Sequence, residues 1–540
     1  MKKYAALMLC AALLLGMLSG CAEQEKEPYV PTGDALVDEN ADLSTLATEP
    51  EKEQDLTLVY YPQKTLHPFE CTDYTNKTVL SLVYQSLFVV DDNYEVHPLL
   101  CEYYSVSEDM MTYTFYIDRD ATFSDGTPVT ADLVADSFNE ALDSYLYSAR
   151  FYNKIQYIET VGGNGVAFHL IDPYENFPIL LDVPIIKVEP SVQPDGEGEQ
   201  TEEKGLPIGS GPYYFDTTNV GIRLLRTVNW WCNQEIAINA SSISLKAAEN
   251  PIQIRDEFEF GDVGLVCADP GADNYADFRC DYELWDIESG IMLYIGFNQD
   301  DEGESVFKDD ALRAAVTYAI NRQQIVDDYF RGYAVPSVLP ASPYSPFYDE
   351  GLADQYGYDP DRFRQAVSAA GLQGEEISLL VNGDDSLRTR IARDIKEMLE
   401  ACGIKVAITE WTGGSYVSAV SARQYDLYLA QTKLSANMDL TPFFYIYGTL
   451  SYGALDNDAA YALCLESLKN EANYYNLHKL VVDQGLICPI LFRSYAVYAT
   501  RGLLTGLTPA RDNVFYYDLG VSMADIQIGD DETPDTLGLE

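Results

Sequence analysis

The chain has 540 residues, and its 34 Lys and Arg against 86 Asp and Glu give a formal net charge of −52. Nucleic acids and anionic membrane surfaces are bound mainly through clustered Lys and Arg, so this composition excludes both as partners of the folded body. An apolar content of 47% and a charged content of 22% are typical of a globular protein, and the length suffices for about three domains.

Residues 1–20 are typical of a secretory signal peptide. Their apolar run, Ala5 to Leu15, is shorter than the about 20 residues that a membrane-spanning helix needs. The next residue is Cys21, and Leu-Ser-Gly-Cys resembles the lipobox of bacterial lipoproteins. This resemblance implies that Cys21 is lipidated and anchors the chain to the outer face of the bacterial cell membrane. An ordinary signal peptide with an incidental cysteine is the alternative.

Residues 21–54 are predicted to form a disordered tether, because they are rich in acidic residues and proline and lack an apolar period. A flexible coil of this length reaches about 30 Å. Residues 189–204 are similarly acidic, and we expect a solvated surface loop there. No other stretch has membrane-spanning length without charges, so contact with the membrane is expected through the N-terminal lipid only.

Cysteine and histidine patterns predict no metal site, no cofactor and no catalytic residue. Eight cysteines remain in the lipidated chain besides Cys21, no CxxC pair occurs, and both disulfides and buried thiols stay possible after export. The four histidines lie outside any HExxH motif, and we expect them to be structural. The cysteines are Cys71, Cys101, Cys232, Cys267, Cys280, Cys402, Cys464 and Cys488, and the histidines are His67, His97, His169 and His478.

One short motif is compatible with hydrolysis. Residues 305–308 (SVFK) match the SxxK pattern of penicillin-recognising enzymes, but the companion SDN and KTG motifs are absent. A serine hydrolase that uses Ser305 is therefore a remote alternative.

The first half of the body contains a strand–turn–helix unit. Residues 112–117 alternate and are β-branched or aromatic, which predicts a strand. Residues 124–128 (SDGTP) predict a turn, and Thr130 is a candidate N-cap for a helix that extends to about Leu142.

Strands and helices then alternate. Residues 291–297 form a nearly continuous apolar run, which predicts a strand buried on both faces. A helix is expected from Asp309 or Asp310, with a restart at Asn321 towards Gly332. Another helix is expected from Asp359-Pro360 to just before Gly371.

A βαβ unit follows. It consists of a strand at 377–381, a helix at 386–401 and a second strand at 404–411, and the two strands should be parallel. A helix around 416–423 and a strand at 425–430 continue the alternation, so this part of the chain is expected to be an α/β domain.

Four segments carry a resemblance to a known family. They are TYTFYIDRDATFSDGTPVTADLVADSFNEAL (112–142), LPIGSGPYYF (206–215), residues 293–336 with LYIGFNQ and VFKDDALRAAVTYAINRQQIVDDYFRGYAVP, and YDPDRFRQAVSAAGL (358–372). In order and spacing they resemble the peptide-type extracytoplasmic solute-binding proteins of ABC importers, solute-binding family 5. With the lipobox, the resemblance covers nearly the whole chain.

The resemblance implies an α/β fold of the two-lobe periplasmic-binding-protein type (type II, large peptide-binding subclass), with an extra subdomain in lobe I. Lobe I would comprise residues 55–288 plus 489–540, with the subdomain at about 70–200, and lobe II residues 289–488. The chain would cross between the lobes near 291–297 and 487–490.

It also implies a function without chemistry. A monomer would capture an extracellular solute, with oligopeptides or dipeptides as the leading class, and deliver it to a cognate ABC permease with its ATPase. The alternatives are a non-peptide solute such as a sugar or metal chelate, and a tethered sensor. The acidic composition predicts that cationic or neutral solutes approach more readily than anionic ones.

The resemblance implies ligand contacts from both lobes. In lobe I they would come from the loop after Leu66-His67-Pro68-Phe69, and in lobe II from two aromatic residues and the stretch 433–439 (KLSANMD). The predicted ligand-binding residues are Thr72, Asp73, Tyr74, Trp411, Tyr416, Leu434, Ser435, Asn437 and Asp439, and Cys71 belongs to the same loop.

One departure weakens the peptide prediction. Peptide carriers of this family commonly have an aspartate just after the strand that corresponds to residues 425–431, and this aspartate pairs with the ligand's amino terminus. In this sequence, that position falls on Ser435 or Ala436. Asn437 or Asp439 would substitute only after a local shift. If Asp439 does so, Asp439→Asn should weaken binding of peptides with free amino termini more than binding of acetylated ones.

Overall fold

The computed structural model describes residues 56–188, 205–217, 221–232, 240–269, 278–300, 303, 305–452, 457–504, 507 and 511. The signal peptide, Cys21, the tether and the acidic segment 189–204 lie outside the described residues, so those expectations stay predictions. Within the described ranges, no helix combines the length and the apolarity needed to cross a lipid bilayer.

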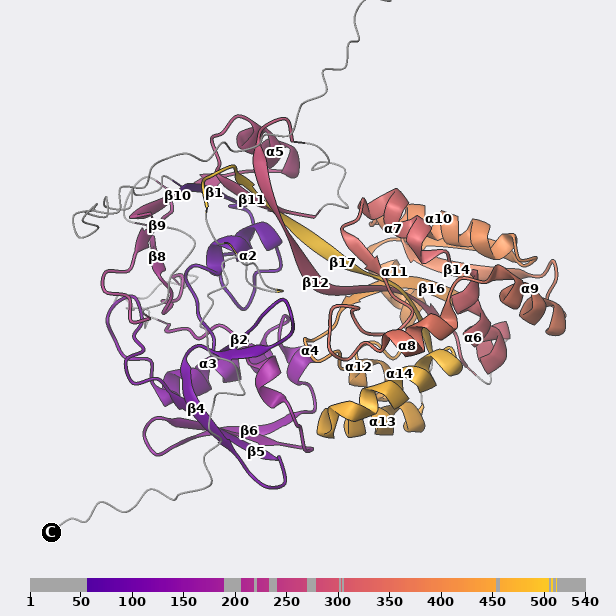
Figure 1. The fold of residues 1–540 in the computed structure, drawn as a ribbon, viewed down its shortest axis with the longest axis horizontal. Coiled ribbons are helices and arrows are strands. Elements are labelled where there is room, and N and C mark those ends of the chain that lie inside the picture. Colours follow the sequence, from indigo (N-terminus) through magenta and orange to yellow (C-terminus); the bar gives the residue numbers. More distant parts are fainter. Residues whose placement is uncertain are drawn as a thin grey trace, which may run out of the picture. The chain divides into compact units, whose positions relative to one another are not determined.

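A large mixed sheet forms the framework of the described chain (Figure 1). Its strand order is β15-β14-β16-β12-β17-β11-β1-β10-β9-β8, and β13 also pairs with β17. The strands are β1 (Leu56–Tyr60), β8 (Tyr213–Asp216), β9 (Arg223–Arg226), β10 (Ser242–Ala247), β11 (Leu265–Ala268), β12 (Tyr282–Phe297), β13 (Ala334–Pro336), β14 (Glu376–Asn382), β15 (Lys405–Trp411), β16 (Leu427–Lys433) and β17 (Ile487–Thr500).

Two long antiparallel strands, β12 and β17, connect two lobes (Figure 1). At one end β17 pairs with β11, and at the other end β12 pairs with β16. We call the part that contains β1–β11 the first lobe, and the part that contains β13–β16 with its helices the second lobe. The predicted strand at 291–297 is confirmed as the second half of β12, but β12 already begins at Tyr282. Most residues of its first half are partly or fully exposed, with only Ile287 and Ser289 buried, so it has no continuous apolar run.

The first lobe contains a second sheet of order β4-β5-β7-β6 and a hairpin, β2-β3. The predicted strand at 112–117 is β5, and Thr130 caps α3 by accepting a hydrogen bond from the Leu133 amide. These elements are β2 (Phe88–Val90), β3 (Val96–Pro98), β4 (Cys101–Val106), β5 (Thr112–Ile117), β6 (Ile155–Val161), β7 (Gly165–Leu170), α2 (Tyr74–Leu80), α3 (Ala131–Asp143), α4 (Ser148–Phe151), α5 (Pro251–Glu259) and the 3₁₀ helix η2 (Phe177–Leu180).

The second lobe contains the predicted βαβ unit, and its strands β14 and β15 are parallel. Asp309 and Asn321 cap α6 and α7 as expected, and α11 begins earlier than predicted, at Gly413. The helices are η4 (Val306–Lys308), α6 (Asp310–Ala319), α7 (Arg322–Phe330), α8 (Glu350–Ala353), η5 (Asp354–Tyr356), α9 (Pro360–Ala369), α10 (Ser386–Glu400), α11 (Gly413–Ser421), α12 (Thr441–Phe444), α13 (Asp458–Lys469), η6 (Glu471–Asn473) and α14 (Tyr474–Asp483).

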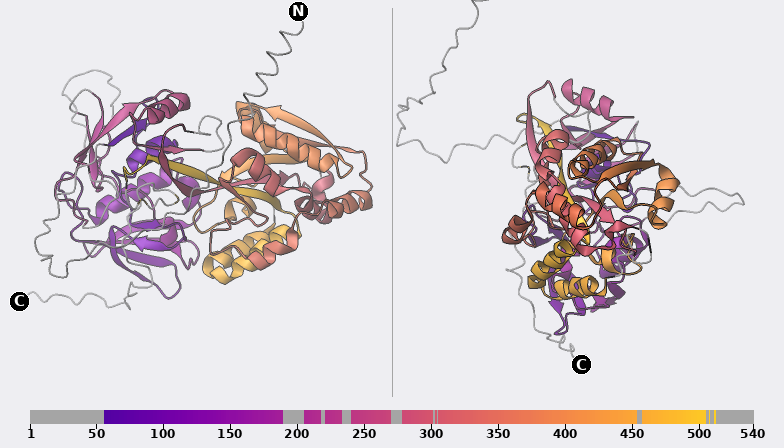
Figure 2. Two further views of the ribbon diagram at one scale, coloured as in Figure 1. Left: turned by 45° about the horizontal axis from the view of Figure 1, so that its top comes forward. Right: turned by 90° about the vertical axis from the view of Figure 1, so that its right-hand side faces the viewer.

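Helices cover both faces of the sheet in the second lobe (Figures 1 and 2). Successive side chains of a strand point to opposite faces. Accordingly, Leu293 and Ile295 of β12 belong to one buried cluster together with α6, α7, α9 and α10, whereas Met292 and Tyr294 belong to another together with α13 and α14. This double burial explains why the sequence of the strand is continuously apolar.

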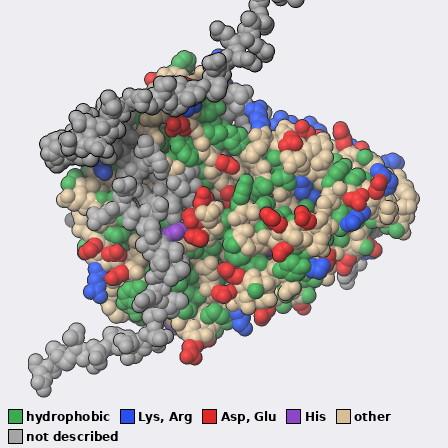
Figure 3. All heavy atoms as spheres, viewed as in Figure 1, with side chains coloured by type: hydrophobic (Ala, Val, Ile, Leu, Met, Phe, Trp, Pro, Cys, Tyr) green, Lys and Arg blue, Asp and Glu red, His purple; other side chains and the backbone are tan. Residues whose placement is uncertain are grey.

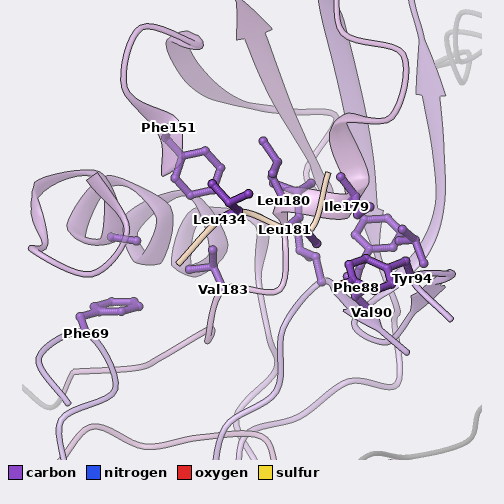
Figure 4. Packing of buried hydrophobic residues seen from close by; sticks show 14 of the residues in the cluster. Phe69, Phe88, Val90, Tyr94, Phe151, Ile179, Leu180, Leu181, Val183 and Leu434 are labelled. Carbon is purple, nitrogen blue, oxygen red and sulfur yellow. The ribbon is translucent and has the colours of Figure 1, made fainter. Parts of the chain in front are cut away.

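The second of these clusters extends from the second lobe into the first. It contains Leu434, which follows β16, as well as Phe151 and Val183 of the first lobe (Figure 4). The apolar side chain that follows β16 therefore belongs to a core shared by the two lobes.

The eight described cysteines form no disulfide with one another, and all of them are buried except the partly buried Cys280. Burial raises the pKa of Cys101, Cys267 and Cys464, which disfavours the reactive thiolate. Of the two expectations that the sequence left open, the structure therefore has buried thiols.

The histidines occupy separate structural positions. His97 Nε2 lies 3.0 Å from Asp91 Oδ2 on the β2–β3 hairpin, and Glu95 lies close enough that the three groups could hold a metal ion. Asp91 Oδ1 accepts hydrogen bonds from the backbone amides of Asn93 and Glu95, so this carboxylate stabilises the turn of the hairpin.

His478 predicts a pH effect on stability. It is fully buried on α14, neither ring nitrogen has a hydrogen-bond partner among the described residues, and burial lowers its pKa to about 3. The unfolded chain binds this proton below pH 6.5 whereas the folded chain does not, so stability is lost as the pH falls from about 6.5 towards 3. Between pH 6 and pH 4, we expect the wild type to lose about 1.4 kcal/mol per pH unit more than His478→Phe. Urea denaturation at several pH values tests this, and parallel pH profiles would contradict it.

Candidate ligand-binding cavity

A cavity of about 640 Å³, which we call cavity A, is lined by both lobes. Small-molecule sites commonly have volumes of about 300–1,000 Å³. The first lobe contributes residues around α2 and α4, and the second lobe contributes the end of β16 and the segment after α12. The lining residues are Pro68, Lys77, Leu80, Ser81, Tyr84, Gln85, Ser86, Tyr145, Leu146, Tyr147, Ser148, Ala149, Arg150, Asp182, Pro184, Lys433, Thr449, Leu450 and Tyr452.

The segment 81–86 forms one wall of cavity A, and the segment GSGPYY (209–214) supports it from behind. The amides of Gly211 and Tyr213 donate hydrogen bonds to the carbonyls of Val83 and Leu82, at 2.9 and 3.1 Å. A Cβ atom at Gly209 would lie 2.0 Å from the Val83 oxygen. The small residues of this segment therefore permit a close approach of two backbones, and the segment is scaffold.

Gln85 presents a free donor at this wall. Its side chain is only 2% exposed, and its Oε1 accepts a hydrogen bond from Trp231 Nε1 at 2.9 Å. This contact fixes the amide orientation, because an indole nitrogen only donates. The amide nitrogen Nε2 then has no hydrogen-bond partner among the described residues. A buried unpaired donor is costly, so a ligand acceptor would satisfy it.

Charged side chains enter cavity A from both lobes. Arg150 forms an ion pair with Asp182, donates to the Leu180 carbonyl at 3.1 Å and lies over the Tyr147 ring. Lys77 of α2 lines the cavity without forming an ion pair to any described residue, and Lys433 enters from the end of β16. The lining therefore has three cationic groups and one carboxylate.

Tyrosines supply much of the remaining lining. Tyr84 donates to the Pro207 carbonyl at 2.8 Å, and the Tyr452 carbonyl accepts a hydrogen bond from the Tyr425 hydroxyl at 2.9 Å. Burial raises the pKa of Tyr84 and of Tyr452, so both hydroxyls stay protonated at neutral pH. These rings offer apolar faces with polar edges, which suits a ligand of mixed character.

The predicted first-lobe residues line a different pocket of about 380 Å³, which we call pocket B. It contains Thr72, Asp73 and Tyr74, the first of which is exposed. Asp73 pairs with Lys64 and caps α2, and the Tyr74 ring stacks on Tyr495 with centroids 4.1 Å apart. Cys71 lies beside them and is buried.

The predicted second-lobe residues 434–439 form a buried contact with the first lobe. Asp439 pairs with Lys154 at 2.7 Å, and the side chains are only 3% and 8% exposed. Asn437 donates to the Tyr174 hydroxyl, and the Asn437 carbonyl accepts from Tyr474 at 2.5 Å.

Leu434, Ser435 and Lys433 of this stretch differ in their burial. Leu434 is buried, and the half-buried Ser435 donates to Asn437 Oδ1 at 2.7 Å. Within the stretch 433–439, Lys433 is the residue found in the lining of cavity A as described.

The two predicted aromatic residues are separate from these groups. Trp411 ends β15 with 46% of its surface exposed, and it is absent from the described linings of cavity A and pocket B. Tyr416 on α11 is partly buried; burial raises its pKa, and nearby Tyr452 contributes to that shift. Tyr416 therefore lies near Tyr452, a residue of cavity A.

Ser305 serves as an N-cap. It is buried, and its hydroxyl accepts a hydrogen bond from the Phe307 amide at 3.3 Å at the start of η4. No hydrogen bond joins Ser305 to Lys308 in the part of the chain that the structure describes. The SxxK pattern therefore has a local structural explanation.

Sequence reasoning missed most of cavity A, notably Lys77, Gln85, Arg150 and Tyr452. One signal was present, because Gln85-Ser86 interrupts an otherwise apolar run from Leu82 to Val90. Polar residues inside a buried segment need hydrogen-bond partners, which marks them for structure or for binding.

Comparisons with known proteins agree with this architecture. The model of the bacterial extracellular solute-binding proteins, family 5 (middle), matches residues 95–453. The chain is 26% identical to the glutathione-binding protein GsiB of Escherichia coli K12 over 369 residues, which cover 66% of this chain and 70% of GsiB.

Two solved structures share the fold. The putative peptide-binding protein AppA from Clostridium difficile has a TM-score of 0.69 at 20% identity, and the match covers 86% of this chain and 100% of AppA. NikA from Brucella suis, in complex with Fe(III)-EDTA, has a TM-score of 0.67 at 19% identity, with the same coverage. The two-lobe α/β fold expected from the sequence is confirmed. The chain belongs to family 5 of the bacterial extracellular solute-binding proteins, which are the substrate-binding components of ABC transporters.

Proposed function

We propose that this substrate-binding protein captures small peptides in cavity A and delivers them to its ABC permease. The observation that carries the proposal is the lining of cavity A, which combines residues of both lobes, hydrogen-bonding groups and tyrosine rings. GsiB and AppA, which are described as glutathione-binding and putative peptide-binding proteins, support the same ligand class. Closure of two lobes around a cleft is a general way to bury a ligand.

The same proposal includes the location and state of the protein. We infer a monomeric, non-enzymatic carrier that is anchored outside the cell membrane by a lipid on Cys21. We retain residues 55–288 plus 489–540 and residues 289–488 as the two lobes, with a subdomain at about 70–200. The family is extracytoplasmic and binds solutes without chemistry, which supports the location outside the cell and the role as a non-enzymatic carrier.

Thermal-shift measurements on the purified protein test the ligand class. We expect tripeptide pools to raise the melting temperature, since a ligand at 100 times its Kd stabilises the folded state by about 2.7 kcal/mol. Stabilisation only by sugars, or only by metal chelates such as Fe(III)-EDTA, would contradict the proposal.

Two variants locate the binding. Tyr452→Ala removes a ring from cavity A and should reduce the peptide-induced shift, whereas Tyr447→Ala removes a nearby ring that is 72% exposed and should leave it unchanged. An equal effect of both variants would place the peptide elsewhere.

A further inference from the structure

The segment 81–86, which forms one wall of cavity A, engages most of its polar groups within the first lobe. Four of its carbonyls accept hydrogen bonds from backbone amides of other first-lobe segments, at 2.8–3.2 Å. Its three hydroxyl groups donate to backbone carbonyls of the same lobe. These groups therefore stabilise the wall itself. The carbonyls belong to Leu82, Val83, Gln85 and Ser86, and the hydroxyls to Ser81, Tyr84 and Ser86.

The side-chain nitrogen of Gln85 differs from these groups. Gln85 is buried, and its Nε2 has no hydrogen-bond partner in the described part of the chain. Its Oε1 accepts from Trp231 Nε1, which also donates to the Ser210 carbonyl at 3.2 Å. Ser210 belongs to the supporting segment 209–214 behind the wall, so the oxygen of the Gln85 amide points away from cavity A. The nitrogen of the same planar amide therefore faces the cavity, which Gln85 lines.

The surroundings of this donor favour a neutral acceptor. Within the described residues, the Gln85 side chain makes no hydrogen bond to a charged group. A buried carboxylate requires a paired charge, whereas a buried carbonyl requires a hydrogen bond. The net charge of the chain is −52, and acidic side chains are spread over the face that Figure 3 shows, which disfavours anionic groups relative to neutral ones. A peptide main chain has a neutral carbonyl at every peptide bond.

Building on the proposed peptide-binding function, we propose that Gln85 Nε2 donates a hydrogen bond to a main-chain carbonyl of the bound peptide. Because every peptide offers this acceptor, the contact does not depend on the sequence of the peptide. Gln85 determines the ligand class instead, since a solute without an acceptor at this place leaves the buried donor unpaired.

The geometry predicts different effects of Gln85→Met on stability and on binding. Methionine keeps the approximate length of the side chain and removes the unpaired donor, and the Trp231 indole retains the Ser210 carbonyl as its acceptor. The melting temperature of the ligand-free protein should therefore stay close to that of the wild type. The affinity for peptide should fall about ten-fold, because the ligand carbonyl loses its donor.

Trialanine and its two thioamide analogues test the contact. Each analogue has sulfur in place of one peptide oxygen, and sulfur is the weaker hydrogen-bond acceptor. By isothermal titration, we expect one analogue to bind the wild type about ten-fold more weakly than trialanine does. In Gln85→Met this difference should disappear. Gln373→Met is the control, because Gln373 is exposed between α9 and β14, and this variant should keep the wild-type ratio.

Three results would overturn the proposal and leave the peptide function intact. The first is a Gln85→Met variant that loses stability but binds trialanine as the wild type does, since Gln85 would then be structural. The second is an affinity that depends on amidation of the trialanine carboxyl terminus and on neither thioamide, since the acceptor would then be the terminal carboxylate. The third is a response to mixed tripeptide pools without binding of trialanine. No response to pools or trialanine would reject both proposals.

Discussion

Replacing Asp439 with asparagine is expected to destabilise the protein by about 3–5 kcal/mol, because it leaves a buried ammonium group without its counter-charge. Lys154 Nζ lies 2.7 Å from Asp439 Oδ2, and both side chains are almost completely buried. The Asp439 carboxylate also accepts hydrogen bonds from the amide and hydroxyl of Thr441, at 2.8 and 2.7 Å. Both of its oxygens are thus engaged within the protein.

Urea denaturation measures this effect, and a surface ion pair provides the control. Asp361 pairs with Arg364 on α9, with side chains 70% and 51% exposed, and Asp361→Asn should cost less than about 1 kcal/mol. The double variant Lys154→Met/Asp439→Asn should be less destabilised than the sum of its single variants, because it removes both charges. Additive losses would contradict a direct pair.

The same variant examines the ligand role that the sequence suggested for Asp439. If Asp439 pairs with a peptide amino terminus, Asp439→Asn weakens binding of free peptides more than that of acetylated ones. With both oxygens engaged, we expect free and acetylated peptides to lose affinity equally. A selective loss for free peptides would favour the ligand role and would require Lys154 to move away.

The secondary structure could be predicted because local signals and burial agree. At α3, α6 and α7, a side-chain cap stands directly before an apolar period, and the structure has each helix where the cap indicates. The first half of β12 was missed because most of its residues are partly or fully exposed, and its length depends on pairing with β17, more than 200 residues further along the chain.

The candidate site was less predictable, since it depends on contacts between distant segments. The stretch 433–439 reads as one polar loop, yet only Lys433 is found in the described lining of cavity A, whereas Asn437 and Asp439 bind Tyr174 and Lys154. No feature of the local sequence distinguishes a residue that lines the cavity from one that pairs within the protein. A buried aspartate and a ligand-binding aspartate have the same sequence signal, and only the position of Lys154 separates them.

Replacing Gly209 with alanine is expected to destabilise the protein by more than about 3 kcal/mol and to deform cavity A. A Cβ atom there would lie 2.0 Å from the Val83 oxygen and 2.8 Å from its carbonyl carbon. These are backbone atoms, so no side-chain rotation relieves the overlap. The Val83 carbonyl also accepts the Gly211 hydrogen bond at 2.9 Å, so moving it breaks the contact that supports residues 81–86.

Gly205→Ala, just before the segment 209–214, is a matched control. Gly205 is exposed, and an added Cβ would meet no atom within 4 Å, so this variant should keep wild-type stability and peptide affinity. Gly209→Ala should lose both, because Tyr84, Gln85 and Ser86 of the displaced segment line cavity A. Melting temperature and peptide titration together measure the two effects. If Gly209→Ala lost stability but kept full affinity, the segment 81–86 would not form the ligand's wall, and cavity A would have to be reassigned.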